Sequence, residues 1–578
     1  MTLRARPVAR RRGRAGWDPG DRRNSLINLG FILAIVLSVL LLAGYAAYTW
    51  YDAHFGGAAI VNGTTITKDQ LVNRIRIENF RLDYVESRIQ TEQAQGHLSA
   101  TDAQSQIDQI TQRRDQIASL TLDRLIDNTL MASLATQEGV TVSQSDIDAQ
   151  MTNEATTQEE RHVWMIQITP NADATSGVST DEQKRTALDK AQQTLAKLKS
   201  GQAWEDVART DSDAGSAAQA GDLGWLPQTS GYDQAFMDAV FATKQGDITG
   251  IIEGSDGAYR IGRYTEDAPA TVDPNFQTAI TNDGISLADY RVAVQGDVLR
   301  TKLSAKVVAD LSQAGPQRHV LEIYLPTPNT PTSGATEDGI KIRQIVFAPN
   351  GDIATGNEVP AEDPAWAKAK AAADAAYITL QAHPDQFDSL ARTKSDETTA
   401  ATTGGKQTWF YPDSTIDQAI SNAIFAAGLK DGQLLPPVKS AYAWHVIQIM
   451  RNSVEGDATF LTNLKATLKT VADFQEAAKD NSEGTGAADG GDAGWIAKGQ
   501  LDPSLERAIF SGQVGQMTDV TSVSGDGTYL VWILAEETRT PTADQLNTFK
   551  TSGFDTWYTA KKGAANIQYL IGSSATTG

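Results

Sequence analysis

The sequence predicts an α+β protein of several domains, preceded by one membrane-spanning helix. One pattern of helix, loop, turn, helix and strand occurs three times, around Trp225, Trp409 and Trp495. A charge-free apolar run covers residues 26–50, and a proline-free stretch with helical periodicity covers residues 68–154. Because 578 residues exceed what one hydrophobic core normally serves, we expect several domains.

The N-terminus combines a basic segment with the apolar run. Residues 1–25 hold eight arginines and two aspartates, a charge of +6, which leaves −27 on the rest of a chain whose total is −21. We predict a cytoplasmic basic tail at 1–25 and a transmembrane helix at 26–50, with the main body outside the cytoplasm. A cleaved signal peptide is the alternative, but the run exceeds the usual apolar core of about 7 to 15 residues.

Composition excludes several classes of function. The chain has no cysteine, so disulfides, thiol catalysis and Cys-ligated metals are excluded. The acidic body argues against nucleic-acid binding, which requires clustered Lys and Arg. His54, His97 and His383 are isolated in the sequence, so neither a metal site nor a Ser-His-Asp triad is indicated, and we expect no cofactor.

Spacing within the three copies agrees to one residue. In each copy an alanine follows an aromatic helix residue by four positions, a glycine follows it by seventeen or eighteen, and the tryptophan comes four later. The aromatic residues are Trp204, Phe387 and Phe474. Regular internal spacing of this kind marks a repeated structural unit.

The text around these anchors resembles the parvulin (PpiC or rotamase) family of peptidyl-prolyl isomerases. The resemblance rests on Gly221-Asp-Leu-Gly-Trp225, on Gly490-Gly-Asp-Ala-Gly-Trp495 and on Trp444-His-Val-Ile-Gln-Ile449. It implies three small antiparallel sheets wrapped by helices. Residues 59–67, 122–130 and 139–143 are similar to the helical chaperone domain of SurA-like foldases.

The order of the segments predicts that some domains are inserted into others. Repeat 3 lacks an opening strand, whereas the strand at 318–325 stands unused before repeat 2, so we assign that strand to repeat 3. The predicted domains are a helical chaperone domain at 55–160, 275–315 and 540–572, repeat 1 at 161–266, repeat 2 at 340–452, and repeat 3 at 317–326 and 457–538.

The resemblance also implies candidate site residues. Parvulins place two histidines from the first and last strands, and an Asp or Cys from the loop before the turn, around an apolar cup for proline. Carried onto this sequence, the candidate catalytic residues are His445, Asp396, His162, Asp213 and His319. Gln344 stands at the first histidine position of repeat 2, and Glu397 is an alternative to Asp396. In repeat 1 the acidic position falls on Ala214 and Arg260 replaces the closing histidine, while repeat 3 has Gly484, beside Glu483, and Leu530 at these positions.

The candidate substrate-binding residues are apolar. They are Ile416, Ile420, Phe425 and Trp409 in repeat 2, Leu223, Tyr232 and Phe236 in repeat 1, and Leu501 and Leu505 in repeat 3. Alternative interpretations remain for both groups. The histidines can stabilise their sheets, the loop acids can cap turns, and the aromatic and aliphatic residues can belong to the cores.

Two classes of function follow. The first is an extracytoplasmic peptidyl-prolyl isomerase and folding chaperone, with repeat 2 the first candidate for activity and repeat 1 the second. The second is a holdase chaperone with catalytically degenerate parvulin domains, because no copy keeps the full polar set. A scaffold for envelope assembly is a third role. The expected partners are unfolded or nascent exported polypeptides that contain X-Pro bonds. The sequence leaves the oligomeric state open.

Overall fold

The computed structural model describes residues 38, 41–43, 45–46, 49, 56–171, 179–328, 339–451 and 456–571. The predicted basic tail lies outside the described residues, as does most of the predicted membrane helix. Within the described ranges, no helix is long and apolar enough to cross a membrane. The chain divides into two compact units, one of residues up to 303 and from 565 onward, the other of residues 304–564.

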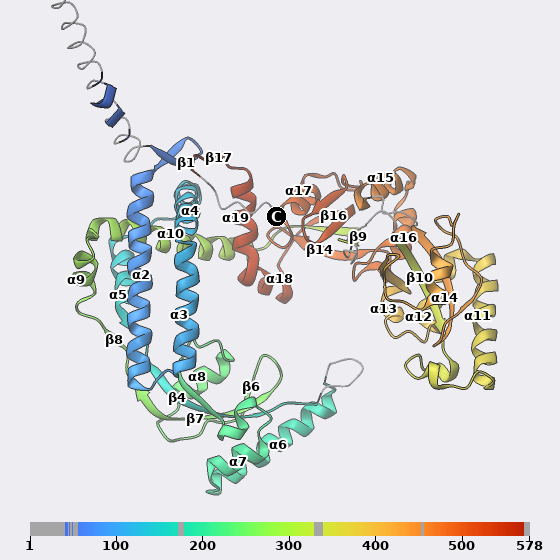
Figure 1. The fold of residues 1–578 in the computed structure, drawn as a ribbon, viewed down its shortest axis with the longest axis horizontal. Coiled ribbons are helices and arrows are strands. Elements are labelled where there is room, and N and C mark those ends of the chain that lie inside the picture. The colour runs from blue at the N-terminus through green and yellow to red at the C-terminus, as the bar shows by residue number, and fades with distance from the viewer. Residues whose placement is uncertain are drawn as a thin grey trace, which may run out of the picture. The chain divides into compact units, whose positions relative to one another are not determined.

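The first unit contains a helical domain (Figure 1). Helix α2 packs against α3 and α4. The helices are α2 (Lys68–Gln95), α3 (Ala100–Asp115), α4 (Ile117–Gln137), α5 (Gln144–Ala155), α9 (Phe276–Asn282) and α10 (Leu287–Leu311). Helix α2 begins at a capping box, in which the Thr67 hydroxyl accepts from the Gln70 amide over 3.2 Å and the Gln70 side chain accepts from the Thr67 amide over 2.8 Å. The core joins Phe80 of α2 to Phe276 and Tyr290.

Two small sheets tie distant parts of this unit together. Strand β1 (Gly57–Val61) pairs with β2 (Thr64–Thr67) and with β17 (Ile567–Tyr569) from the end of the chain. Strands β3 (Thr156–Thr157) and β8 (Thr271–Val272) pair where the chain leaves the helical domain for repeat 1 and where it returns. Repeat 1 therefore starts and ends at one point of the helical domain, as an inserted domain does.

Repeat 1 is a four-stranded antiparallel sheet with the order β5-β4-β7-β6. Its strands are β4 (Glu160–Ile168), β5 (Asp222–Pro227), β6 (Ile252–Glu253) and β7 (Tyr259–Ala268). Ile166 packs on one face with Trp204 of α7 (Trp204–Asp211), and α6 (Asp181–Lys199) covers the same side. On the other face Met165 packs with Phe236 of α8 (Gln234–Ala242).

Repeat 2, in the second unit, has the corresponding sheet order β11-β10-β13-β12. Its strands are β10 (Ile340–Phe347), β11 (Lys406–Phe410), β12 (Val438–Lys439) and β13 (Trp444–Arg451). Ile345 packs with α11 (Pro364–Ala382) and α12 (Phe387–Lys394) on one face. Ile342 packs on the other with α14 (Gln418–Ile424), and the short α13 (Ala400–Thr403) precedes β11.

Repeat 3 has the sheet order β14-β9-β16-β15. Its strands are β9 (Gly315–Pro326), β14 (Asp492–Ala497), β15 (Thr521–Val523) and β16 (Gly527–Arg539), and its helices are α15 (Asp457–Thr467), α16 (Val471–Asn481) and α17 (Pro503–Ser511). Strand β9 pairs with β14 and β16 of repeat 3, while repeat 2 opens with its own strand β10. This pairing supports the proposed insertion of repeat 2 into repeat 3.

The C-terminal helices differ from the prediction, which placed 540–572 in the helical domain. Helices α18 (Ala543–Thr548) and α19 (Phe554–Gly563), with the π-helical turn Phe549–Gly553 between them, belong to the second unit, and only β17 joins the first. Both a hydrogen bond and helix packing attach these helices to repeat 3. Gln545 is buried and donates to the Trp495 carbonyl of repeat 3 over 2.9 Å, and α19 packs on α17.

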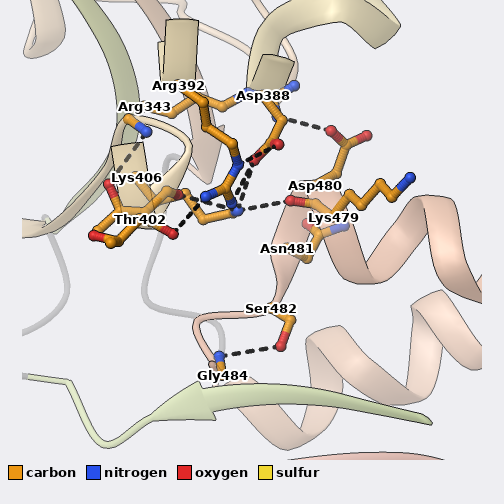
Figure 2. A network of polar contacts seen from close by, with 12 residues as sticks. Arg343, Asp388, Arg392, Thr402, Lys406, Lys479, Asp480, Asn481, Ser482 and Gly484 are labelled. Carbon is orange, nitrogen blue, oxygen red and sulfur yellow. Dashed lines mark hydrogen bonds and ion pairs between the residues drawn. The ribbon is translucent and has the colours of Figure 1, made fainter. Parts of the chain in front are cut away.

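A polar interface joins repeats 2 and 3 within the second unit (Figure 2). Arg343 on β10 lies 2.7 Å from Asp480, and the Lys406 ammonium donates to the carbonyl of Lys479 over 2.6 Å. Lys341 pairs with Glu483 over 2.7 Å. Burial lowers the pKa of Lys406 to about 8. The end of α16 and the loop that follows it are therefore attached to the opening strand of repeat 2.

Candidate active site

Three backbone hydrogen bonds, one in each repeat, identify equivalent positions in the three opening strands. In each repeat the amide of one strand residue donates to the carbonyl of the turn glycine over 2.7 or 2.8 Å. The strand residues are Met165, Gln344 and Glu322, and the glycines are Gly221, Gly405 and Gly491. These three strand positions are equivalent. His162 and His319 each lie three residues before their repeat's member of the set.

A serine in each repeat identifies the equivalent positions in the loop that precedes the turn. Its hydroxyl accepts from the amide two residues further along, over 3.2 to 3.3 Å. The serines are Ser212, Ser395 and Ser482, and the amides belong to Ala214, Glu397 and Gly484. The acidic position of the loop therefore carries a carboxylate only in repeat 2, where the residue is Glu397.

The closing strand supplies the third position. Arg260, His445 and Tyr529 lie opposite the residue two positions after the aligned strand residue, namely Gln167, Val346 and Tyr324. Sequence spacing assigned Leu530 to repeat 3, but Leu530 pairs with Ile323. A shift of one residue moves a side chain to the opposite face of the sheet. The closing residue of repeat 3 is therefore Tyr529.

In repeat 2 these positions form one hydrogen-bonded chain. His445 Nδ1 lies 3.0 Å from Gln344 Oε1, and its Nε2 lies 2.9 Å from Ser440 Oγ. An amide oxygen only accepts, so Nδ1 carries the proton and Nε2 accepts from the serine hydroxyl. Gln344 Nε2 continues the chain toward the Glu397 carboxylate at 3.4 Å, and Gln407 Nε2 donates to that carboxylate over 3.0 Å.

Burial sets the charge of this chain. It lowers the pKa of His445 to about 4, so the imidazole is neutral at neutral pH, in agreement with the tautomer that the contacts require. Burial also raises the pKa of Glu397, an effect that hydrogen bonds from Gln407 and Gln344 oppose. The site therefore presents a neutral, oriented imidazole beside a carboxyl group.

An apolar wall lies on the same face of the sheet as Gln344. Ile416, Ile420 and Phe425 are partly buried and pack against the cluster that contains Ile342 and Ile447. Ile342 precedes Gln344 by two residues, so their side chains share a face. These three candidate substrate-binding residues therefore adjoin the polar chain.

Trp409 does not belong to this wall. Its side chain is 3% exposed, and the Arg451 guanidinium lies 4.6 Å from the centre of its ring. It pairs with Lys341, which lies three residues before Gln344 and so on the opposite face. We therefore assign Trp409 to the core of repeat 2 instead of to substrate binding.

Asp396 and Asp213 anchor loops in the structure. The Asp396 carboxylate accepts from the Ala348 amide over 2.8 Å. The Asp213 carboxylate accepts from the Thr169 amide over 2.9 Å and pairs with Lys190 over 3.0 Å. Both side chains thus bind the end of an opening strand, and the carboxyl group of the polar chain in repeat 2 comes from Glu397.

His162 and His319 occupy a different place from the one predicted. Their Nε2 atoms lie 2.8 Å from Asp222 and Asp492 respectively, and their rings stack on Trp225 at 5.6 Å and Trp495 at 5.3 Å. They stand an odd number of residues from Met165 and Glu322, so they point to the other face. We therefore assign His162 and His319 to the stabilisation of their sheets, the alternative interpretation that the sequence offered.

Repeat 1 does not contain the polar chain. Met165 and Ala214 stand where repeat 2 has Gln344 and Glu397, and Arg260 is held by Asp256 over 2.6 and 2.9 Å. Leu223 is partly buried and packs with Met165 and with Phe236, which is fully buried. Tyr232 is 39% exposed and lies outside this cluster. The proposed cup of repeat 1 is therefore largely filled by its own core.

Repeat 3 keeps an apolar face that includes the two predicted leucines. Leu505 is 3% exposed, and Leu501 is partly buried against the same cluster, which also contains Val320 and Val531. Sequence reasoning missed Glu322 on this face, and in repeat 2 it missed Ser440 and Gln407. The sequence does contain a signal that these strand positions are equivalent. Met165 and Gln344 are each followed directly by isoleucine and, five residues after them, by proline. Glu322 is also followed directly by isoleucine.

Comparison with known proteins agrees with the repeated domain. Two family models, both described as PPIC-type PPIASE domain, match residues 149–262 and 457–537 in one case and 352–451 in the other. The chain belongs to the PPIC-type family. The three matched segments fall on the three repeats, and the match in repeat 2 includes both Glu397 and His445.

The curated relatives and solved structures cover parts of the chain. "Chaperone SurA" of Methylococcus capsulatus is 24% identical over 297 residues, which are 47% of this chain and 62% of that protein. The "Foldase protein PrsA" of Bacillus subtilis is 35% identical over 77 residues, 13% of this chain and 26% of that protein. A crystal structure of a PpiC-type peptidyl-prolyl cis-trans isomerase domain, 24% identical, covers 20% of this chain and 95% of that one, with a TM-score of 0.17. The chain spans 62% and 54% of the length of the first two SurA relatives that it matches.

Proposed function

We propose that this PPIC-type protein is an extracytoplasmic peptidyl-prolyl cis-trans isomerase and folding chaperone, with repeat 2 as its catalytic domain. The observation that carries the proposal is the chain from Ser440 through His445 and Gln344 to Glu397. Its members come from two strands and two loops of the fold and meet beside an apolar wall. Neither of the other repeats has this set.

The chemistry needs no covalent step. Rotation about the X-Pro bond faces a barrier of about 20 kcal/mol, because amide resonance is lost when the bond twists. An enzyme lowers this barrier by binding the twisted amide better than either planar isomer. Oriented polar groups beside an apolar surface can do so, since they require no reorganisation at the moment of reaction.

Each part of the repeat 2 site has a role in this proposal. The apolar wall of Ile416, Ile420 and Phe425 holds the proline ring. The Gln344 amide faces the twisting X-Pro bond. His445, which is bonded on both ring nitrogens, fixes the orientation of Gln344 together with Ser440 and Glu397. A neutral imidazole suits this role, because a charged one beside buried apolar groups carries a desolvation cost.

The helical domain supplies a second binding region. Within the first unit, a cavity of about 590 Å³ is lined by Tyr84, Val85, Arg81 and Glu154 of the helical domain together with Pro227 and Thr229 of repeat 1, and it reaches the buried core residues Phe80, Phe276 and Tyr290. Pockets that combine apolar and aromatic side chains with a few polar groups are typical binding sites. We propose that exported polypeptides with exposed aromatic residues bind there while repeat 2 acts on their X-Pro bonds.

The predicted anchor and domain boundaries form part of the proposal. The apolar run at 26–50 would hold the protein in the membrane by a single helix, with residues 1–25 on the cytoplasmic side and the body outside. The parvulin domains would be 161–266, 340–452, and 317–326 with 457–538. The helical domain would keep 55–160 and, of the predicted segment 275–315, the part up to residue 303, whereas 543–563 would belong with repeat 3.

A holdase is the second candidate function, and repeat 1 favours it. That domain has no polar chain, because it carries Met165 and Ala214 at the strand and loop positions and an Arg260 that is paired with Asp256. Its sheet order and its turn are the same as in repeat 2. A domain of this kind can bind client chains without rotating their bonds. The two candidates differ in whether isomerisation depends on repeat 2.

The deciding experiment measures cis-trans exchange on a proline-containing peptide by exchange NMR with the full chain. We expect catalysed exchange in the wild type and its loss or strong reduction in His445→Ala. The matched control is His383→Ala, which removes an exposed histidine of the same repeat. If the wild type gives no catalysed exchange while it still suppresses aggregation of an unfolded client, the holdase is the correct function.

A further inference from the structure

Repeat 3 contains a carboxyl group at a position that the family resemblance did not indicate. Glu322 lies on β9 at the position equivalent to Gln344, and it follows Val320 of the apolar cluster by two residues. Its side chain therefore shares a face with Leu505. Within the described part of the chain, the Glu322 carboxyl group makes no hydrogen bond to another side chain or amide, so it is available to a ligand.

The loop of repeat 3 is shaped to admit this carboxyl group. Gly484 occupies the position that carries Glu397 in repeat 2. A Cβ atom placed on Gly484 would lie 2.8 Å from Glu322 Oε1, closer than real Cβ contacts allow. The two changes therefore compensate. Repeat 2 has an amide on the strand and a carboxyl group on the loop, and repeat 3 has the carboxyl group on the strand and no side chain on the loop.

The closing position of repeat 3 also carries a hydrogen-bonding side chain. Tyr529 stands where repeat 2 has His445, and it packs against the same apolar cluster as Leu505. Its hydroxyl donates to Asp526 over 2.5 Å, and the Tyr324 hydroxyl donates to the same carboxylate over 3.1 Å. The two tyrosine rings lie 4.8 Å apart. Asp526 thus fixes both rings beside Glu322.

Repeat 1 is the internal comparison. It has Met165 at the strand position and Ala214 at the loop position, so neither element brings a carboxyl group to its face. Of the three repeats, repeat 3 combines a glutamate at the strand position with a glycine at the loop position. The arrangement in repeat 3 is a substitution of one polar set for another.

We propose that repeat 3 holds a second site for X-Pro peptides, in which Glu322 and Tyr529 take the places of Glu397 and His445. The inference rests on the proposed function of repeat 2, since it transfers that reaction to an equivalent position. The proline ring would lie against Leu501 and Leu505. The Glu322 carboxyl group, in its protonated form, would donate a hydrogen bond to the lone pair that the prolyl nitrogen regains when the amide twists.

The surroundings of Glu322 favour its protonated form. Burial and the charge of Asp526 raise the pKa of Glu322 to about 7. The other titratable groups near it are Tyr324 on β9, Tyr529 on β16 and Glu483 in the loop after α16. Lys341 of repeat 2 pairs with Glu483 over 2.7 Å. The contribution of repeat 3 to catalysed exchange should therefore fall as the pH rises through about 7.

The test uses exchange NMR on a proline-containing peptide with the full chain in a His445→Ala background, where repeat 2 is disabled. We expect residual catalysed exchange, which Glu322→Leu lowers by about tenfold or more, the loss of a hydrogen bond to a buried group. Gly484→Ala in the same background should have the same effect, because its Cβ displaces the Glu322 carboxyl group without altering the apolar face. The matched control is Asp489→Asn, an exposed acid of the same repeat.

The outcomes separate this inference from the function of repeat 2. If His445→Ala alone abolishes catalysed exchange, repeat 3 is not a second site and the proposed function of repeat 2 stands. If residual exchange survives Glu322→Leu and Gly484→Ala in folded protein, the activity lies elsewhere and the inference is overturned. If the wild type catalyses no exchange, both proposals fail together.

Discussion

Repeats 1 and 2 share one fold and differ in whether polar groups meet on the apolar face of the sheet. Both have the same strand order, the same turn glycine and the same serine in the preceding loop. In repeat 2 the strand and loop positions carry Gln344 and Glu397, whereas in repeat 1 they carry Met165 and Ala214. The fold of the domain therefore does not depend on the polar groups at these two positions.

The residue at the closing-strand position also differs between the two repeats, in its charge. His445 is neutral, buried and hydrogen-bonded on both ring nitrogens, so its orientation is fixed. Arg260 stands at the equivalent place and is bound by both oxygens of Asp256. A guanidinium held in this way cannot turn toward a substrate without leaving Asp256 unpaired. The closing position of repeat 1 therefore carries a charged group paired within its own loop, whereas that of repeat 2 carries a neutral imidazole.

The largest expected effect that would test this comparison is the pH dependence of the stability of repeat 2. The pKa of His445 is lowered by burial to about 4, below its usual 6.5. The unfolded state therefore binds the proton first as the pH falls, and the stability that depends on neutral His445 is present above pH 6.5 and lost toward pH 4. The full loss is about 3 kcal/mol.

Hydrogen exchange of strand β13, followed from pH 7 to pH 4 and corrected for intrinsic rates, measures this loss locally. The equivalent strand β7 carries Arg260, which does not titrate in this range, and serves as the control. Equal pH dependence in the two strands would contradict the assignment of a neutral, buried His445.

The second prediction converts the strand position of repeat 2 into that of repeat 1. Gln344→Met removes the hydrogen bond to Nδ1 of the buried His445 and one of the two glutamine hydrogen bonds to Glu397, which keeps its bond from Gln407. Each loss is worth about 1 to 3 kcal/mol, so we expect kcat/KM for the proline peptide to fall about thirtyfold or more. The matched change in repeat 1, Met165→Leu, should leave the rate unchanged. A rate that fell equally in both variants would show that the two repeats contribute alike.

Sequence reasoning reached the repeated unit but not its register. The spacing of Trp225, Trp409 and Trp495 predicted three copies because turn geometry fixes the distance between a glycine and the strand that follows it. The Arg161-His162 and Arg318-His319 pairs then misdirected the choice of site histidines. They lie on the same strands as the site, but an odd number of residues from it, and side chains alternate between faces.

The acidic position shows the limit of counting in loops. Asp396 and Glu397 are adjacent, and only the contacts of Ser395 and Ala348 decide which side chain caps the strand and which faces the site. Glu322 could not be identified from the family pattern, since its role depends on the absence of a side chain at Gly484. That dependence joins residues far apart in the sequence and becomes visible only in the folded domain.

The third prediction separates the two adjacent acids of repeat 2. Glu397→Gln keeps the size of the side chain but replaces an acceptor that two glutamine amides share. We expect about a fivefold fall in kcat/KM, the loss of about 1 kcal/mol of hydrogen bonding. Asp396→Asn should leave kcat/KM near the wild-type value and instead lower the thermal stability, because Asp396 anchors the Ala348 amide. The reverse pattern would return the catalytic assignment to Asp396.

The smallest expected effect concerns the histidines that the sequence favoured and the structure places on the other face. His162→Ala removes a ring stacked on Trp225 and bonded to Asp222, and His319→Ala removes the equivalent ring in repeat 3. Each change should cost about 1 kcal/mol of stability, the usual worth of such a contact. Neither should alter kcat/KM by more than about twofold, since neither ring shares a face with the polar chain or with Glu322. Exchange NMR and thermal melts on the same samples measure both quantities. A large fall in exchange with unchanged stability would mean that His162 or His319 reaches the substrate, and that the register aligned through Met165, Gln344 and Glu322 does not define the sites.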